Sequence, residues 1–303
     1  MSLYLKHRPT KLDDIVGNKE VTEPLAKLLK QKEVPHAFLL TGTSGCGKTT
    51  IGRIIAKEVG SKGFDIKEID SADFRGIDTV RKIRNDSQFS PTESKALVWI
   101  MDEVHQLTSA AQNALLKILE DTPKHVYFVL CTTEEQKIIK PIKGRCQVFN
   151  VNPLDDNEMI SLLKDVAKKE GEKIDTKILK IIAKSAFWQP RNALQILEQV
   201  IAVPKKNRAK IASKIVSLEN LSIDLARLLI KRGTGWKEVR EVLKGLKTQE
   251  PETIRRTVLG YCTAVLLNKD DERIGLVMEH FIDPFYDSAF NGVVYASYSV
   301  IKS

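Results

Sequence analysis

Short apolar runs alternate with stretches of helical spacing over residues 38–150. Five runs are rich in β-branched or aromatic residues, as buried strands are, and they cover residues 38–41, 65–70, 96–102, 125–133 and 146–151. Between the third and fourth runs, apolar residues recur at helical intervals, at Ala110, Ala114, Leu115, Ile118 and Leu119. Strands that alternate with helices are typical of a parallel sheet covered on both faces. The pattern therefore predicts an α/β domain with a five-stranded parallel sheet over residues 1–152.

The pattern changes after the fifth run. Three helical segments with few strand signals follow, and they predict a small helical domain over residues 153–205. Asp155 or Asp156 suits the N-cap of the first segment, and Asp175 suits that of the second. Pro190 suits the first turn of the third segment.

Residues 206–303 contain further amphipathic segments, separated by turn signals at 233–235, 251 and 283–284. They predict an all-α C-terminal domain. The polar, basic stretch 204–210 that precedes them is interpreted as a linker.

Composition narrows the class of protein. The 303 residues carry 48 Lys and Arg against 39 Asp and Glu, a net charge of +9 that is compatible with binding a polyanion. No apolar run is long enough for a membrane span, and residues 1–10 lack the apolar core of a signal peptide. We therefore expect a cytoplasmic protein without membrane contact, in which the four cysteines are reduced thiols rather than zinc ligands.

A phosphate-binding sequence follows the first predicted strand. Residues 42–50 read GTSGCGKTT, which matches GxxxxGK followed by Ser or Thr, in the required strand–loop–helix context. Glycines let the backbone curl so that its N–H groups point at phosphate oxygens, and the helix N-terminus adds a favourable dipole. Lys48 can neutralise the β- and γ-phosphates, and the Thr49 hydroxyl can bind Mg²⁺. The predicted nucleotide contacts are Gly42, Thr43, Ser44, Gly45, Cys46, Gly47, Lys48, Thr49 and Thr50.

The third predicted strand ends in two acidic residues, Asp102 and Glu103. This is the carboxyl end, where parallel sheets bind their ligands. Asp102 can hold the Mg²⁺ shell through water, and Glu103 can polarise an attacking water. We expect this strand and the strand before the phosphate loop to be near neighbours. Together the two motifs predict hydrolysis of a nucleoside triphosphate.

Six segments, taken in order, resemble one family. They are LKHRPTKLDDIVGNKEV, HAFLLTGTSGCGKTT, DSADFRGIDTVRKIRN, IMDEVHQLTSAAQNALLKILEDTP, FVLCTTEEQKIIKPIKGRCQVF and PRNALQILEQV. Over residues 4–200 the chain resembles the clamp-loader AAA+ ATPases, namely the gamma/tau subunit of bacterial DNA polymerase III and the small subunits of replication factor C. The resemblance implies an AAA+ P-loop domain, a helical lid, a helical collar for oligomerisation over 206–303, and ATP with Mg²⁺ as cofactors.

The resemblance assigns further residues to the nucleotide. Contact with its adenine side is implied for Arg8, Pro9, Val16 and Gly17. Thr133 matches sensor 1 of the family, a hydroxyl that positions the γ-phosphate or the attacking water. Arg191 matches sensor 2, an arginine that brings the lid onto bound ATP. On their own, Thr133 could be an ordinary strand-end threonine and Arg191 a solvated cation, although a cation is unfavourable in a first helical turn.

The tripeptide Gly144-Arg145-Cys146 matches the family's Ser-Arg-Cys interface motif at two of its three positions, with Gly144 in place of the serine. In the family this arginine acts in trans on the ATP of the neighbouring subunit, and the alternative is a solvated loop residue. His7 stands at the family's aromatic position and is given no role. The sequence lacks the four-cysteine zinc module of the gamma/tau subunit, which favours the compact, replication factor C-like or phage-like form.

Positive charge gathers over residues 71–85, after the second predicted strand, where Lys82 and Arg84 add to two further arginines. The resemblance implies that this segment and the start of the next helix follow the DNA backbone, through Arg75, Gly76, Ile77, Arg81, Ser109 and Gln112. Such contacts carry no base information. A solvated basic helix face is the alternative reading.

We therefore expect an ATP-dependent subunit of a sliding-clamp loader from a bacterial or phage-infected cell. Several copies or relatives would form an open, pentameric ring around primer–template DNA and a sliding clamp, and ATP hydrolysis would release the clamp. One alternative is another AAA+ DNA motor of the branch-migration type, which would bring a C-terminal winged helix with strand signals. A structural loader subunit is the other, and the intact Lys48, Asp102 and Glu103 argue against it.

Overall fold

The computed structural model describes residues 1–186, 188–268 and 270–303, except for the side chains of residues 210 and 213–220. The chain divides into two compact units, Met1–Val203 and Pro204–Ser303. The first unit contains both the predicted α/β domain and the predicted lid, so the boundary expected near residue 152 stays a prediction. In the described part of the chain, no helix combines the length and the apolar composition that crossing a bilayer requires.

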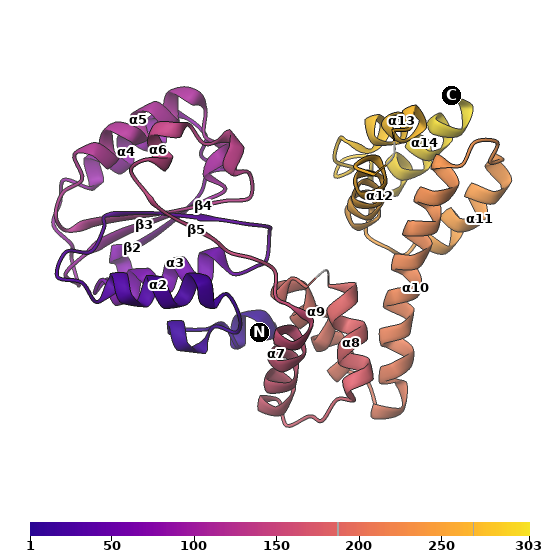
Figure 1. Cartoon of the computed structure of the whole chain (residues 1–303), viewed down its shortest axis with the longest axis horizontal. Coiled ribbons are helices and arrows are strands. Elements are labelled where there is room, and N and C mark those ends of the chain that lie inside the picture. Colours follow the sequence, from indigo (N-terminus) through magenta and orange to yellow (C-terminus); the bar gives the residue numbers. More distant parts are fainter. Residues whose placement is uncertain (187, 269) are drawn as a thin grey trace. The chain divides into compact units, whose positions relative to one another are not determined.

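A five-stranded parallel sheet forms the centre of the first unit (Figure 1). Its strands are β1 (Ala37–Thr41), β2 (Ile66–Asp70), β3 (Leu97–Asp102), β4 (Val126–Thr132) and β5 (Gln147–Asn150), in the spatial order β2-β3-β4-β1-β5. All four pairings are parallel. The predicted strands are confirmed, with ends that differ by at most one residue. β4 lies between β1 and β3, which are therefore second neighbours.

Helices cover both faces of this sheet (Figure 1). One face carries α2 (Lys19–Leu29) and α3 (Lys48–Glu58), and the other carries α4 (Ile77–Asp86), α5 (Ser109–Glu120) and α6 (Lys140–Lys143). Successive side chains of a strand point to opposite faces. Accordingly, Phe38 and Leu40 of β1 join the core beneath α2 and α3, whereas Leu39 joins the core beneath α4 and α5. Burial on both faces explains why the strands read as continuous apolar runs.

Helix α3, which begins at the phosphate loop, approaches the sheet closely at Gly52. A Cβ atom added there would lie 3.1 Å from Val129 Cγ1 of β4 and 3.5 Å from Ile100 Cγ2 of β3. The contact to Val129 is tighter than ordinary van der Waals packing. Glycine at this position therefore lets α3 rest directly on the two central strands.

Three lid helices complete the first unit, α7 (Asp156–Lys169), α8 (Thr176–Ser185) and α9 (Pro190–Ile201). Asp155, rather than Asp156, caps α7 in a capping box with Glu158. Asp175 caps α8, as predicted.

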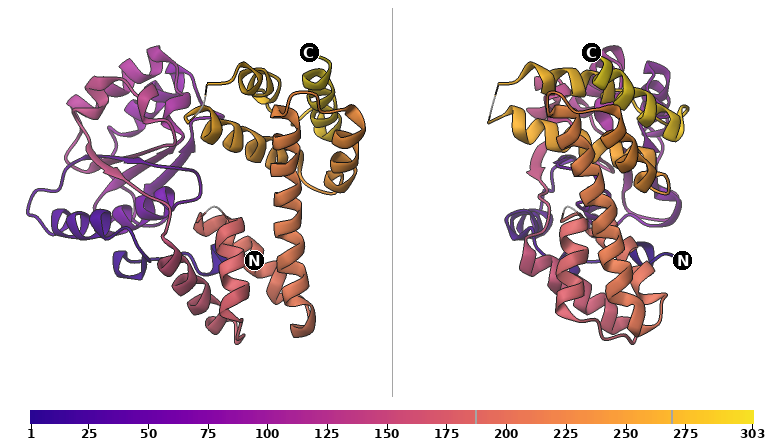
Figure 2. Two further views of the ribbon diagram at one scale, coloured as in Figure 1. Left: turned by 45° about the vertical axis from the view of Figure 1, so that its right-hand side comes forward. Right: turned by 90° about the vertical axis from the view of Figure 1, so that its right-hand side faces the viewer.

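The second unit is helical throughout its described residues, with α10 (Lys205–Ile230), α11 (Trp236–Leu246), α12 (Pro251–Leu266), α13 (Glu272–Phe281) and α14 (Ala289–Lys302). The all-α prediction is confirmed. The stretch 204–210, interpreted as a linker, begins where the two units divide, but residues 205–210 are not an irregular connection and open α10, which is one continuous helix (Figure 2). Lysine, arginine and alanine are good helix formers, so a basic composition did not exclude a helix there.

A buried carboxylate fixes the loop between α4 and β3. Asp65, at the end of the 3₁₀ helix η2 (Gly63–Asp65), is 3% exposed. It accepts hydrogen bonds from the N–H groups of Thr92 and Glu93, both at 2.8 Å, and from Ser94 Oγ at 2.7 Å. Burial raises the pKa of Asp65, but these hydrogen bonds outweigh burial and leave its pKa below the ordinary value.

Asp65→Asn should therefore destabilise the first unit, because its amide N–H₂ group would face one of these donors; we expect a loss of about 1–3 kcal/mol at neutral pH. Since the folded-state pKa is depressed, the contribution of Asp65 is present above the unfolded pKa of about 3.9 and is lost as the pH falls through the folded value. Denaturant unfolding at neutral and acid pH measures the difference, with exposed Asp73→Asn as the control. An equal gap between wild type and Asp65→Asn at both pH values would contradict this account.

Candidate active site

A cavity of about 310 Å³ lies at the carboxyl ends of the strands, beside the lid helices α7 and α9. Its size is that of a small-molecule site. Thirteen of the residues predicted from the sequence line it, namely Arg8, Pro9, Val16, Ser44, Gly45, Cys46, Gly47, Lys48, Thr49, Thr50, Asp102, Glu103 and Arg191. Gly17, Gly42, Thr43 and Thr133 do not line it, although Gly17 and Thr43 are chain neighbours of residues that do. The structure thus brings together the phosphate loop, the acidic pair and the lid arginine.

The phosphate loop connects β1 to α3. Gly42, Gly45 and Gly47 have φ values of 137°, 77° and 112°, which side chains other than glycine rarely adopt. Their conformations turn the loop back on itself, so that Lys48 Nζ donates hydrogen bonds to Gly42 O at 2.7 Å and Thr43 O at 2.9 Å. The ammonium group therefore lies inside the curl, where phosphate oxygens would bind.

Thr49 and Asp102 meet at the wall of the cavity. Thr49 Oγ1 lies 3.0 Å from both carboxylate oxygens of Asp102. Burial raises the pKa of Asp102, and hydrogen bonds from Thr49 and Cys131 oppose that rise. A hydroxyl and a desolvated carboxylate that converge in this way are oxygen ligands of the kind that Mg²⁺ prefers. The residues present therefore fit a magnesium ion.

Glu103 is held from the neighbouring strand. Its backbone is in the left-handed region, with φ of 49°, which is uncommon for a residue other than glycine. Glu103 Oε2 accepts a hydrogen bond from Thr133 Oγ1 at 2.8 Å and another from Thr133 N at 3.3 Å. Thr133 directly follows β4, so it reaches the acidic pair although it does not line the cavity.

Two arginines face the cavity from opposite segments of the chain. Arg8 Nη1 is buried and has no hydrogen-bond partner among the described residues. Burial lowers the pKa of Arg8, and the neighbouring charge of Arg53 lowers it further. Arg191, in the first turn of α9, donates its backbone N–H to Gly45 O at 3.5 Å. A half-buried guanidinium with one buried nitrogen that has no partner among the described residues, near a second cation, fits an anionic ligand.

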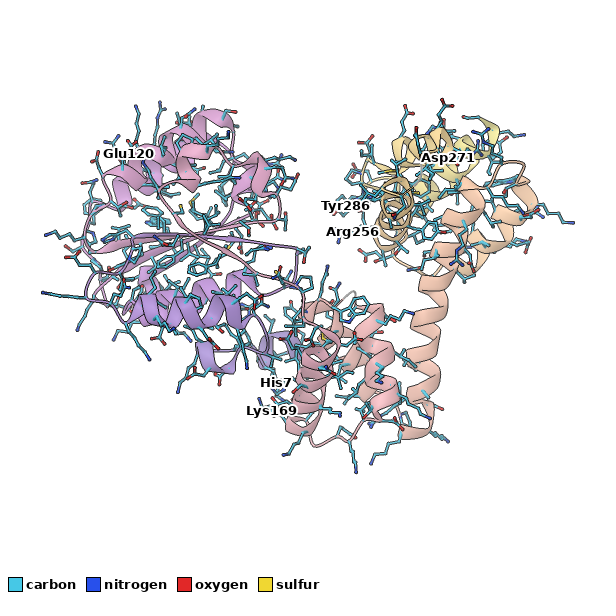
Figure 3. The ribbon with its side chains drawn as sticks, in the orientation of Figure 1. His7, Glu120, Lys169, Arg256, Asp271 and Tyr286 are labelled. Carbon is cyan, nitrogen blue, oxygen red and sulfur yellow. The ribbon has the colours of Figure 1, made fainter. Side chains whose placement is uncertain are left out.

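Sequence reasoning missed eleven lining residues, which are Tyr4, His7, Ile15, Asn18, Ile51, Asp70, Val151, Leu154, Leu162, Pro190 and Leu194. His7, given no role above, lines the cavity, and Glu170 Oε1, directly after α7, lies 2.5 Å from His7 Nε2. Figure 3 labels His7 and Lys169, the residue before Glu170. Its position next to Arg8 and Pro9 was a usable signal. The apolar lid residues carried none, because ordinary core positions have the same spacing.

Arg145 lies outside the cavity, after the short helix α6. Its guanidinium forms an ion pair with Glu120 at the end of α5, with Nη2 and Oε1 2.5 Å apart, and donates to Pro141 O at 3.2 Å. The next residue, Cys146, packs against the core and has a pKa raised to about 12 by burial. The structure thus places Arg145 on the surface at an anchored chain position.

The residues predicted to follow DNA are mostly exposed. Arg75, Gly76, Arg81 and Ser109 are accessible and Ile77 is half-buried, with Gly76 at the N-cap of α4 and Asp78 paired to Arg81 at 2.9 Å. The prediction for Gln112 is wrong. Its side chain is 4% exposed, donates to Lys137 O at 3.2 Å and accepts from Ile139 N at 3.0 Å. Both ends of the amide are used inside the protein, so none is available to a phosphate.

Asp102→Asn should raise the unfolding temperature of the nucleotide-free protein at neutral pH by about 1–4 °C, because the ionised carboxylate is desolvated. A carboxyl whose folded pKa is raised costs stability above that pKa, and the cost disappears as the pH falls to the unfolded value. The same variant should lose the additional stabilisation that Mg²⁺ gives in the presence of ATP.

Thermal unfolding with and without ATP and Mg²⁺ measures both effects. Asp121→Asn, on the exposed end of α5, is the matched control and should keep the Mg²⁺ effect. A lower unfolding temperature for Asp102→Asn, or a Mg²⁺ effect of wild-type size, would show that Asp102 is not the ligand described.

Sequence comparison finds relatives that cover about two thirds of the chain. A family model described as DNA polymerase III, delta subunit, matches residues 61–155. The DNA polymerase III subunit gamma of Buchnera aphidicola subsp. Schizaphis graminum is 36% identical over 226 residues, which are 68% of this chain and 62% of that protein. Subunit tau of Bacillus subtilis is 36% identical over 222 residues, 66% of this chain and 39% of that protein. The chain thus spans less than two thirds of the length of these relatives.

Solved structures match over a larger part of the chain. A point mutant of RuvB from Thermotoga maritima superposes with a TM-score of 0.62 at 20% identity, covering 79% of this chain and 86% of that one. A second Thermotoga maritima structure, the RuvB Holliday junction branch migration motor, gives 0.58 at 21% identity, covering 88% and 89%. At such identities the likeness shows the fold alone. By its fold, its motifs and its DNA polymerase III relatives, the chain belongs to the clamp-loader family of AAA+ ATPases.

Proposed function

We propose that this chain is an ATP-hydrolysing subunit of a sliding-clamp loader in DNA replication. One observation carries the proposal: the phosphate loop and the acidic pair Asp102 and Glu103 converge on one cavity, while Arg145 lies outside it on the surface. An arginine in that position suits a ring in which each subunit completes the site of the next. The relatives, which are DNA polymerase III subunits gamma and tau, point to the same process.

The phosphates of ATP would bind against the loop. Phosphate oxygens can replace Gly42 O and Thr43 O as the acceptors for Lys48 Nζ. Thr49 Oγ1 and, through water, Asp102 would hold Mg²⁺, which supplies positive charge to the β- and γ-phosphates. Arg8, whose buried Nη1 lacks a partner among the described residues, would gain one from the nucleotide.

Glu103 would orient the attacking water, with Thr133 fixing its carboxylate. The neighbouring subunit's copy of Arg145 would stabilise the charge that develops in transfer. To do so it must leave Glu120, an exposed partner whose ion pair contributes little free energy. ATP binding would thereby order an open, pentameric ring of copies or relatives, held together by the second unit as a collar.

DNA would run along the starts of α4 and α5. Gly76 and Ile77 offer backbone N–H groups at the start of α4, and Arg75, Arg81 and Ser109 flank them. These groups suit backbone phosphates and no particular base. The sliding clamp is the remaining partner, and we propose that the assembly acts in the cytoplasm.

The rival functions have less support. A branch-migration motor with a winged helix would need strands in its C-terminal domain, and residues 204–268 and 270–303 contain only helices and their connections. A structural subunit would not need Lys48, Thr49 and Asp102 around one cavity. ATPase activity with and without primed DNA, clamp and partner subunits tests the choice. Turnover that clamp and DNA leave unchanged would overturn the clamp-loader assignment.

Arg145→Ala should leave ATP binding by the isolated chain within about twofold of wild type and reduce clamp- and DNA-stimulated hydrolysis by about 100-fold or more. The reason is that the arginine acts only on the neighbour's nucleotide. Fluorescent-nucleotide binding and stimulated steady-state turnover measure the two quantities. Lys143→Ala, which removes a cation two residues away, is the control. Stimulated turnover of wild-type rate in Arg145→Ala would return this arginine to the role of a surface residue.

Reversing the charge of Arg75 and Arg81 together should weaken DNA binding by the assembled complex. Each phosphate contact contributes about 0.9 to the slope of log affinity against log salt concentration, so the slope should fall by about two. Titrations at several salt concentrations measure it. The double change Lys164→Glu with Lys168→Glu on α7 alters net charge equally and should keep the wild-type slope. Equal slopes for both double variants would mean that α4 does not contact the duplex.

A further inference from the structure

A buried histidine lies between two carboxylates beside the acidic pair. His105, in the 3₁₀ helix η3 (Val104–Gln106), has a side chain that is 4% exposed. Its Nδ1 lies 3.3 Å from Glu103 Oε2 and 3.0 Å from Thr132 Oγ1. Its Nε2 lies 3.2 Å from Glu134 Oε1 and 3.0 Å from Gln106 Nε2. Both ring nitrogens of this buried side chain therefore lie near carboxylates.

The contacts of Nδ1 bear on the carboxylate assigned to orient water. A carboxylate oxygen only accepts hydrogen bonds, so its approach to Nδ1 is favourable when that nitrogen carries a proton. Thr132 Oγ1, the other group at Nδ1, is itself fixed, because it accepts the backbone N–H of Glu134 at 3.0 Å. The imidazole is therefore held in place on the side that faces Glu103.

All described contacts of the Glu103 carboxylate reach one of its two oxygens. Thr133 Oγ1, Thr133 N and His105 Nδ1 all lie within 3.3 Å of Oε2. Among the described residues, Oε1 has no hydrogen-bond partner, and Glu103 lines the cavity. One oxygen is thus anchored and the other is left to accept a hydrogen bond from water. The left-handed backbone of Glu103 does not by itself fix the orientation of the carboxylate, so the side-chain contacts set its direction.

The far side of the ring connects to the segment that carries the surface arginine. Glu134 directly precedes η4 (Glu135–Lys137), which leads into α6 and then to Arg145. Glu134 also pairs with Lys137 at 2.8 Å, and that contact holds its carboxylate beside His105. The charged groups around the ring are therefore Glu103 on one side and Glu134 with Lys137 on the other.

We infer that His105 is a positioning residue for hydrolysis, which anchors Glu103 Oε2 through a proton on Nδ1 while Nε2 accepts the amide N–H of Gln106. The inference rests on the proposed function in requiring that Glu103 orient water, but it does not require a clamp or DNA. It goes beyond the roles of the phosphate loop, the acidic pair and Thr133.

Two substitutions of His105 distinguish the roles of its two ring nitrogens. The amide of asparagine can take the place of Nδ1, and the longer glutamine places its amide near Nε2. His105→Asn should therefore keep kcat within about threefold of wild type, whereas His105→Gln and His105→Ala should lower kcat by about 30-fold. KM for ATP should stay within about twofold in all three, because the phosphate loop is untouched.

His125→Asn and His125→Gln, directly before β4 and so at the opposite end of that strand from Thr133, provide the same substitutions outside the site and should match wild type. Basal ATP turnover without clamp or DNA is the assay, so that failure of clamp stimulation would sink the clamp-loader proposal and leave this one standing. Equal losses in His105→Asn and His105→Gln, or a change confined to KM, would overturn the positioning role.

A second measurement does not depend on turnover. In a spectrum of ¹⁵N-labelled histidine side chains, the signal of His105 is identified by its loss in His105→Asn. Glu103→Gln should shift the Nδ1 resonance of His105, and the exposed control Glu93→Gln should not. An unshifted Nδ1 resonance in Glu103→Gln would show that the two side chains do not interact, and would overturn the inference even in a protein that hydrolyses no ATP.

Discussion

The parallel register of the three central strands is the constraint on which the site depends. Thr41, the last residue of β1, pairs with Thr132, the last residue of β4, and β3 ends beside them at Asp102. Strands that run in parallel and stay in register end at one edge, so the phosphate loop, the acidic pair and Thr133 arrive together. Helices bury both faces of the sheet, and a slip of one residue would turn apolar side chains to the wrong face. The geometry of the candidate site therefore rests on the same burial that stabilises the fold.

Much of this arrangement could be predicted because it depends on local pattern. The strands appear in the sequence as apolar runs, and the glycines of the loop indicate left-handed backbone. Asp175 stands directly before its helix, at the N-cap position. Parallel topology then implies that strand ends meet. Even the choice between Asp155 and Asp156 was left open only because both residues satisfy the same capping rule, and the hydrogen bond from Glu158 N selects the first.

The failures share a physical cause. Gln112 has the sequence context of a surface residue, and only the folded chain brings the carbonyl of Lys137 and the amide of Ile139 to its side chain. His105 is surrounded by groups from residues 103 to 134, and no spacing rule pairs them. His7, near the N-terminus, contacts Glu170 of the lid, which is far away in the sequence. The burial and the partners of polar side chains depend on tertiary structure, so the pattern of residue types along the chain does not specify them.

The contact at Gly52 constrains which substitutions position 52 tolerates. Helix α3 carries Lys48 and Thr49 on its first turn and rests on β3 and β4 through a position with room for a hydrogen atom only. Any side chain there would have to be accommodated by a shift of a few tenths of an ångström in Val129 or in the helix itself. The second outcome would change the distance from Thr49 to Asp102. A substitution at position 52 is thus coupled to the packing of Val129, and a change in the apolar core can move the candidate site although neither residue lines the cavity.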